Sequence, residues 1–208
     1  IPPYPALVPF TLSPEILQES KKLAGVSVLA SVKIGKRVFN EGLLFTHKGL
    51  SGPAILQISS YWQTGQEITI NLAPEIDIFS WLKNKRDNKA KQNIQNLLTN
   101  LLPKTLVDFL LRKYELDGGL ADLSNKKLQE IAENINNWKI IPNGTEGFAK
   151  AEVTLGGVDT NEISSKNLES KKVKNLYFIG EVLDVTGHLG GYNFQWAWSS
   201  GFACGQFV

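Results

Sequence analysis

The sequence predicts an α+β protein of several parts, in which a small helical subdomain is nested inside a β domain and a strand-loop-helix unit follows. Two patterns lead to this fold class. Alternating segments rich in β-branched residues stand on both sides of a long stretch with helical periodicity. A nearly continuous apolar run at residues 175–179 is typical of a strand buried on both faces of a parallel sheet. With 208 residues, of which 42% are hydrophobic, the chain can bury a sizeable core.

The first part of the chain indicates one helix followed by strands. Ser13-Pro14-Glu15 supplies an N-cap residue, a proline suited to the first helical position and an acid, and it predicts a helix to about Leu23. Residues 26–34 and 37–45 alternate on either side of a tight turn, which predicts a β-hairpin. Residues 67–72 predict a further strand.

Helical spacing then runs from residue 77 to residue 138. Leucine and isoleucine residues recur at intervals of three and four, Gly118-Gly119 is expected to stop one helix, and Ser124 is expected to cap the next. Strand alternation resumes at residues 149–155. The helices therefore interrupt a β unit that begins before them and finishes after them.

Charge and cysteine content narrow the protein's surroundings. The net charge is only +2, and the sequence contains a single cysteine, Cys204, and no apolar stretch long enough to span a bilayer. These features predict a cytoplasmic protein without a membrane partner, and they do not indicate an oligomeric state. The chain contains no methionine and opens on Ile1-Pro2-Pro3, so we expect it to be a fragment of a longer protein.

The C-terminal region contains the residues with the strongest chemical interest. The apolar run ends at Gly180, and two acids, Glu181 and Asp184, follow within four residues. Polar ligands bind beyond the carboxyl ends of strands in open α/β sheets, where glycine allows close approach and a carboxylate can accept hydrogen bonds from hydroxyl groups. A strand, a turn and a solvated acid are the alternative interpretation.

A glycine-rich loop, residues 187–193, leads directly into an apolar helical run at residues 194–206. The unpaired N–H groups and the positive end of such a helix would suit a carbonyl or an anion above Gly190 and Gly191, such as the pyrimidine edge of a reduced flavin. A flexible loop before a core helix is the alternative. Cys204, Trp196 and Trp198 are interpreted as core residues.

Three blocks, residues 42–59, 156–163 and 168–205, resemble the bacterial flavoproteins of the BaiN/RdsA-like family, also known as aminoacetone-oxidase-type FAD enzymes. The resemblance implies a Rossmann-like FAD domain interrupted by an insert. It implies a β-barrel-like insert domain at 1–76 and 139–158, a helical subdomain at 77–138, and the C-terminal part of the FAD domain at 159–208. It also implies an oxidoreductase that acts on an unidentified small organic substrate and exchanges electrons with NAD(P)H or dioxygen.

The same resemblance implies which residues bind the cofactor. They are Gly180, Glu181, Asp184, Gly190, Gly191, Tyr192, Asn193 and Gln195. Relatives of this kind often have aspartate where this chain has Glu181, so either Glu181 or Asp184 could contact the flavin. The chain has no G-x-G-x-x-G motif to hold a pyrophosphate. We therefore expect it to bind FAD weakly or not at all, and a non-catalytic recognition or structural module is the alternative function.

Other features are weaker candidates. His47 and His188 could act in catalysis, but a loop histidine is more often structural or solvent-exposed. Eight basic residues and two acids lie between Trp81 and Tyr114, a local charge of +6. A nucleic-acid-binding helical module is the alternative interpretation of this patch, but solvated helix faces often look the same. The sequence thus predicts no nucleic-acid partner and no metal.

Overall fold

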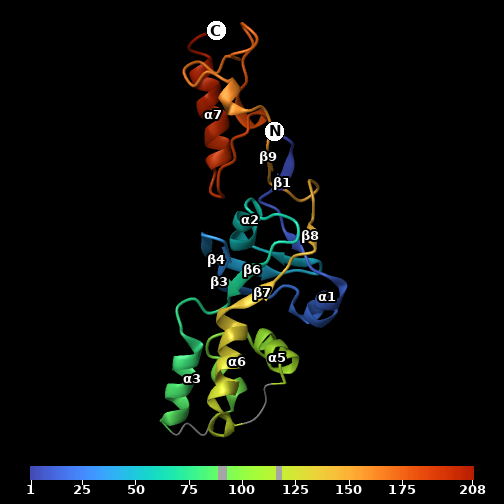
Figure 1. Ribbon diagram of the computed structural model, residues 1–208, viewed down its shortest axis with the longest axis vertical. Coiled ribbons are helices and arrows are strands. Elements are labelled where there is room, and N and C mark those ends of the chain that lie inside the picture. Colours follow the sequence, from blue (N-terminus) through green and yellow to red (C-terminus); the bar gives the residue numbers. More distant parts are fainter. Residues whose placement is uncertain (89–92, 116–118) are drawn as a thin grey trace. The chain divides into compact units, whose positions relative to one another are not determined.

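The computed structural model describes residues 1–88, 93–115 and 119–208. The chain divides into two compact units (Figure 1). The barrel-helix unit comprises Pro9–Gly144, and the C-terminal unit comprises Ile1–Val8 together with Thr145–Val208. The finer domain boundaries expected from the sequence remain a prediction.

The barrel-helix unit is built on a seven-stranded sheet with the order β7-β6-β3-β4-β5-β2-β8. These strands are β2 (Phe10–Thr11), β3 (Ser27–Ile34), β4 (Arg37–Phe45), β5 (Gly49–Ser51), β6 (Ile68–Asn71), β7 (Trp138–Ile140) and β8 (Gly144–Thr145). Neighbouring pairs from β7 to β2 are antiparallel. The sheet is open, since β7 and β8 lie at its two ends. The predicted α+β fold, with a β part and a helical part, is confirmed.

The hairpin predicted from the alternating pattern is confirmed as β3 and β4. Ile34 pairs with Arg37 across a turn that contains Gly35 at φ +53. Alternate side chains of β3, including Val32 and Ile34, are buried. Because hydrophobic alternation fixes the buried face of a strand, this register could be read from the sequence. The predicted strand near residue 70 is confirmed as β6.

Two short helices accompany the sheet. The predicted N-terminal helix is confirmed as α1 (Pro14–Ser20), continued by the 3₁₀ turn η1 (Lys21–Leu23). The second helix, α2 (Pro53–Ser59), packs against β3 and β4 (Figure 1). Ser51 pairs with Leu44 in the sheet, and Gly52 is the N-cap residue of α2.

The helical part of this unit contains α3 (Ile78–Asp87), α4 (Ile94–Leu98), α5 (Lys104–Lys113), the turn η2 (Leu120–Asp122) and α6 (Asn125–Asn136). Ser124 caps α6 as predicted, since its side chain accepts a hydrogen bond from the Lys127 N–H. Helix α5 ends at Lys113, before the glycine pair expected to stop it, and Gly118 lies outside the described residues. The buried helical side chains, such as Leu106 and Leu128, share one hydrophobic core with the sheet.

The C-terminal unit pairs the start of the chain with a segment far along it. Strand β1 (Tyr4–Ala6) is antiparallel to β9 (Val153–Leu155), the only part of the predicted strand at 149–155 that forms. The other elements are the 3₁₀ turns η3 (Thr160–Glu162) and η4 (Gly180–Val182) and the helix α7 (Tyr192–Cys204). A small core contains Ile163, Leu168, Leu183 and Cys204.

The strand predicted at residues 175–179 is not formed. Tyr177 makes one isolated antiparallel bridge to Glu169, and Ile179 is 45% exposed. A parallel strand needs hydrogen-bonding neighbours, and the described part of this unit supplies only isolated bridges here. No described helix has the length and apolar character required to cross a membrane.

Candidate flavin-binding site

Gly180 is fixed in position by helix α7. Its N–H donates to the Ser200 hydroxyl at 2.9 Å, and its carbonyl accepts from the Trp196 indole N–H at 3.0 Å. Ser200 is only 2% exposed, and Gly180 has φ +67. Because a positive φ is costly for residues with a side chain, glycine suits this turn. The η4 turn is thus held on α7 by two hydrogen bonds, of which the bond to Ser200 is buried.

The two acids after Gly180 have different surroundings. One carboxylate oxygen of Asp184 accepts from the Gly156 N–H at 3.0 Å, and the Asp184 N–H donates to the Val158 carbonyl at 2.9 Å. Asp184 therefore supports the turn at Gly156. Glu181 is exposed on η4, and no hydrogen bond or ion pair links its carboxylate to another described residue.

The glycine loop is held by one buried amide. The Asn193 side chain accepts from the Gly187 N–H at 2.7 Å and donates to the Gly187 carbonyl at 3.1 Å. Asn193 is 9% exposed, so both groups of its amide are used inside the unit. Asn193 therefore fixes the conformation of the loop that precedes α7.

Helix α7 begins without a side-chain cap. Its N-cap is Gly191 at φ +88, next to Gly190 at φ +109, and a Cβ on Gly191 would meet no atom within 4 Å. The first N–H groups of a helix have no intrahelical acceptor and lie at its positive end. The start of α7 can thus donate hydrogen bonds to an anionic or carbonyl oxygen placed above these two glycines.

The remaining predicted residues lie around this helix start. Tyr192 is 64% exposed, and the Gln195 side chain donates to the Ser199 hydroxyl at 2.8 Å. His188 is exposed in the loop. His47 belongs to the barrel-helix unit, where it is exposed between β4 and β5.

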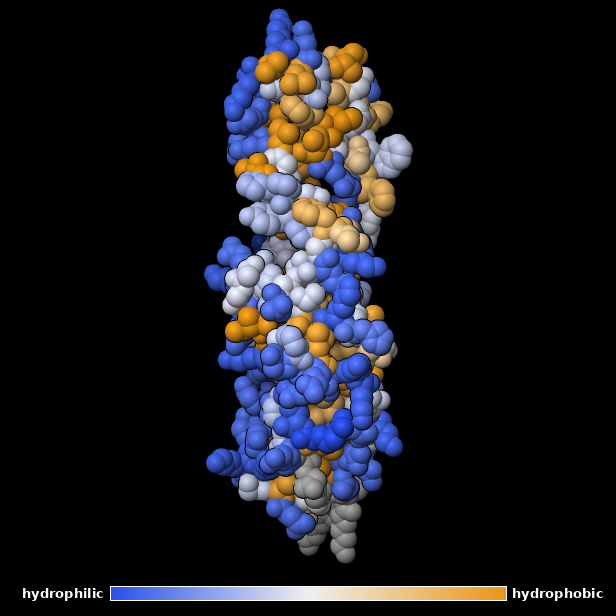
Figure 2. Space-filling view, turned by 90° about the vertical axis from the view of Figure 1, so that its right-hand side faces the viewer, coloured by the Kyte–Doolittle hydropathy of each residue, from blue (hydrophilic) through white to orange (hydrophobic). Residues whose placement is uncertain are grey.

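One face of α7 is aromatic and exposed. Phe194, Trp198 and Phe202 lie one helical turn apart and are 73%, 76% and 73% exposed. Figure 2 shows apolar side chains gathered over the C-terminal unit. Trp198 was expected in the core, and this expectation is wrong, because it lies on the face opposite Trp196 and Ser200. The expectation that Cys204 is buried is confirmed.

Trp196 and Ser200 are the residues whose role the sequence did not predict. They are four positions apart, so they lie on the same face of α7 and reach Gly180 together. The one sequence signal for this role was the hydroxyl of Ser200 within an otherwise apolar helix. Their partner is 16 to 20 residues away in the sequence, which the local pattern could not indicate.

The arrangement fits the ring end of a flavin. The uncapped start of α7 supplies donors for a carbonyl edge, and the open space above Gly191 leaves room for it. The carboxylate of Glu181 is available to accept hydrogen bonds from hydroxyl groups. Among the described residues, no group of three or more His, Cys, Asp or Glu side chains is placed to hold a metal ion.

An open antiparallel sheet with a nested helical part and, in the other unit, a glycine-rich turn before an uncapped helix place this chain in the α+β class. Residues 4–153 match the family model described as "HI0933-like protein barrel and H2TH domain", and the chain belongs to this HI0933-like family. The predicted flavoprotein resemblance is thereby confirmed at the level of the family.

Curated relatives extend over nearly the whole chain. A ribosomal RNA dihydrouridine synthase of Escherichia coli (strain K12) is 51% identical over 208 residues, which is 99% of this chain and 52% of the relative. The protein of the same name in Haemophilus influenzae is 47% identical over 207 residues, 98% of this chain and 51% of the relative. A 3-dehydro-bile acid delta(4,6)-reductase of Clostridium scindens is 30% identical over 201 residues, 89% of this chain and 49% of the relative.

The chain thus spans about half the length of the curated relatives it matches. Their names correct two expectations. None of these three is named an aminoacetone oxidase, so the finer part of the predicted family name is not supported. The prediction of no nucleic-acid partner is wrong, because two relatives at 51% and 47% identity are named for ribosomal RNA. That prediction interpreted the basic stretch between Trp81 and Tyr114 as a solvated helix face, and composition alone does not distinguish such a face from one that binds nucleic acid.

Proposed function

We propose that this chain is the insert domain and flavin-facing end of a longer FAD-dependent reductase that converts uridine in ribosomal RNA to dihydrouridine. The observation that carries the proposal is 51% identity, over 99% of the chain, to a protein of that name. The proposed substrate is therefore a nucleobase in RNA, where the sequence predicted a small organic molecule. A substrate of this kind is consistent with the expected cytoplasmic location.

The names of the relatives share one kind of chemistry. Dihydrouridine is uridine with a saturated C5–C6 bond, and the name delta(4,6)-reductase also denotes reduction of double bonds. A bound flavin supplies hydride for such a reduction. NAD(P)H is the proposed electron donor, because dioxygen accepts electrons from a reduced flavin and cannot supply those that this reduction consumes. The Rossmann-like character of the flavin domain is part of the same proposal.

The residues of this chain would bind and orient the ring. The N–H groups at the start of α7 would donate to its pyrimidine carbonyl, and the positive helix end favours negative charge there. Asn193 holds the loop that carries Gly190 and Gly191. Gly180, fixed by Ser200, sets the position from which Glu181 would accept hydrogen bonds from the ribityl hydroxyls.

Matched amide substitutions separate the two acids. Glu181→Gln should weaken FAD binding by the full-length protein by about tenfold or more, because a charged acceptor is lost. Asp184→Asn should bind FAD nearly as the wild type does, because the asparagine carbonyl can still accept from the Gly156 N–H. Dissociation constants from flavin fluorescence give the comparison. A larger loss in Asp184→Asn would exchange the roles of the two residues.

The function is tested in cells that lack the gene. We expect nucleoside mass spectrometry of their purified ribosomal RNA to show less dihydrouridine, and the full-length gene should restore it. Unchanged dihydrouridine would contradict the proposal.

The 208-residue chain alone would be a recognition and structural module. The observation in favour is the missing G-x-G-x-x-G motif, which leaves no glycine loop for the pyrophosphate. We expect the purified chain to be colourless and to bind FAD weakly. Submicromolar binding in a fluorescence titration would contradict this part of the proposal.

A further inference from the structure

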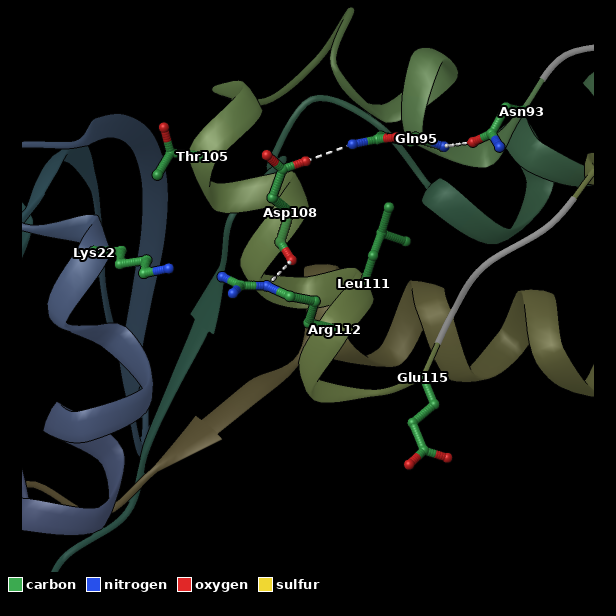
Figure 3. Close-up of a pocket in the computed structure, with 8 residues that line it drawn as sticks. All are labelled: Lys22, Asn93, Gln95, Thr105, Asp108, Leu111, Arg112 and Glu115. Carbon is green, nitrogen blue, oxygen red and sulfur yellow. Dashed lines mark hydrogen bonds between the residues drawn. The ribbon is translucent and has the colours of Figure 1, made fainter.

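A cleft of about 660 Å³ lies in the barrel-helix unit, between the turn η1 and helix α5 (Figure 3). This volume is within the usual range for sites that hold small molecules or a nucleotide. Its walls carry polar and charged side chains: Lys22, Asn93, Gln95, Thr105, Asp108, Arg112 and Glu115, together with Leu111.

Two cations face each other across this cleft. Lys22 extends from η1 and Arg112 from α5, and Figure 3 shows their nitrogen atoms directed toward one another. The Arg112 Nε donates to the Asp108 backbone carbonyl at 3.0 Å, which leaves the two terminal nitrogens for the cleft. Neither cation forms an ion pair with a carboxylate among the described residues. Like charges repel in this arrangement, and an anion between them would remove the repulsion.

The two acids that line the cleft, Asp108 and Glu115, form no ion pair with Lys22 or Arg112 among the described residues. The Asp108 carboxylate accepts from the Gln95 amide at 2.6 Å, and Figure 3 shows the Glu115 carboxylate directed away from Arg112. The exposed Thr105 hydroxyl lines the same cleft. Hydroxyl groups, arginine and lysine are the groups that most often contact phosphate oxygens in nucleic acids.

A second hollow, of about 410 Å³, adjoins the first, because both are lined by Lys22 and Arg112. It also contains Lys113, whose charge is paired with Glu19. The two unpaired cations therefore stand at the junction of two hollows. A chain of phosphates passing from one hollow to the next would contact both cations, which favours a polymer over a single phosphate ion.

We propose that the cleft between η1 and α5 binds the phosphate backbone of the RNA substrate, through Lys22 and Arg112. The inference rests on the proposed function and adds a binding surface to it. Lys22 lies outside the basic stretch between Trp81 and Tyr114 that the sequence singled out. Lys89 and Lys91 of that stretch lie outside the described residues.

The test is the salt dependence of RNA binding by the full-length protein. The probe is a fluorescein-labelled oligouridine of about 20 nucleotides, because backbone contacts are independent of sequence. The variant is Lys22→Gln with Arg112→Gln. The matched control is Lys83→Gln with Lys126→Gln, which removes two charges from α3 and α6, away from this cleft. Circular dichroism establishes that both variants are folded.

A plot of the logarithm of the association constant against the logarithm of the salt concentration has a negative slope. We expect the cleft variant to make this slope shallower by about 1.4, since each contact with single-stranded nucleic acid contributes about 0.7. Binding would then be about 25-fold weaker at 0.1 M salt, and the two lines would meet near 1 M. The control variant should keep the wild-type slope. Equal slopes for the cleft variant and wild type, or equal losses in both variants, would overturn the inference. Dihydrouridine formation by the wild type tests the proposed function separately, so a failure of one is distinguishable from a failure of the other.

Discussion

Replacing Gly52 with alanine tests the close packing of α2 on the hairpin. Gly52 has φ +89, and a Cβ on it would lie 2.7 Å from the Gly42 carbonyl oxygen and 2.9 Å from the Leu44 nitrogen. Both contacts are with backbone atoms of β4, which cannot rotate away as a flexible side chain could. Either β4 or the start of α2 would have to move.

Gly65 offers a matched control, because it has φ +86 but no atom within 4 Å of a Cβ. Gly65→Ala should lower the free energy of unfolding by about 1–2 kcal/mol, the usual penalty of a left-handed conformation. In Gly52→Ala the backbone penalty is about 1–3 kcal/mol, because φ +89 with ψ 162 is a conformation essentially limited to glycine. A steric penalty of about 1–3 kcal/mol adds to it, which gives a total of about 2–6 kcal/mol.

Urea unfolding followed by far-ultraviolet circular dichroism measures both losses. The comparison uses the same chain with one substitution at a time, at one temperature. If the two variants lost the same free energy, the close approach of Gly52 to β4 would be refuted.

Two further predictions concern the C-terminal unit. Ser200→Ala removes the acceptor of the buried Gly180 N–H and should destabilise this unit by about 1–3 kcal/mol. Faster amide hydrogen exchange at Gly180 measures this loss. Ser199→Ala, at an exposed position, is the control and should have a much smaller effect. The pKa of Glu169 is lowered from its ordinary value of 4.5 by the Asn175 N–H and then by the Asn167 side chain. Its stabilising contribution is therefore present above the ordinary carboxyl pKa and is lost as the pH falls through the lowered value. Glu169→Gln should remove this contribution, so the stability of the variant should depend less on pH in the acid range. A pKa of Glu169 at or above 4.5 in an NMR titration would contradict the prediction. The same pH dependence of stability in the variant and the wild type would also contradict it.

The sequence predicted well those elements whose formation depends on residues close together in the chain. The β3–β4 hairpin depends on alternation and a short turn, and the start of α6 depends on Ser124, three positions from its hydrogen-bond partner. The run at 175–179 satisfied the same composition rules but found no strand to pair with. Hydrophobicity indicates that a segment prefers burial, whereas strand formation also requires neighbouring backbone groups.

The same distinction between local and long-range causes applies to the candidate site. Residues 180–195 could be singled out because glycines, acids and a helix start fall within a short stretch. The individual tasks of Asp184 and Asn193 depend on partners that only the folded unit reveals. The two cations Lys22 and Arg112 are 90 positions apart, so a count of charges along the sequence does not show that they line the same cleft.

The pairing of β1 with β9 has an evolutionary consequence. The chain leaves the C-terminal unit after Val8 and returns at Thr145. Inside the unit, Ala6 and Val153 are direct partners in an antiparallel ladder. Opposed residues in such a ladder are only about 5 Å apart, a gap that a hairpin turn of a few residues can close. The intervening segment can therefore be gained, lost or exchanged as a cassette without altering the unit into which it is inserted.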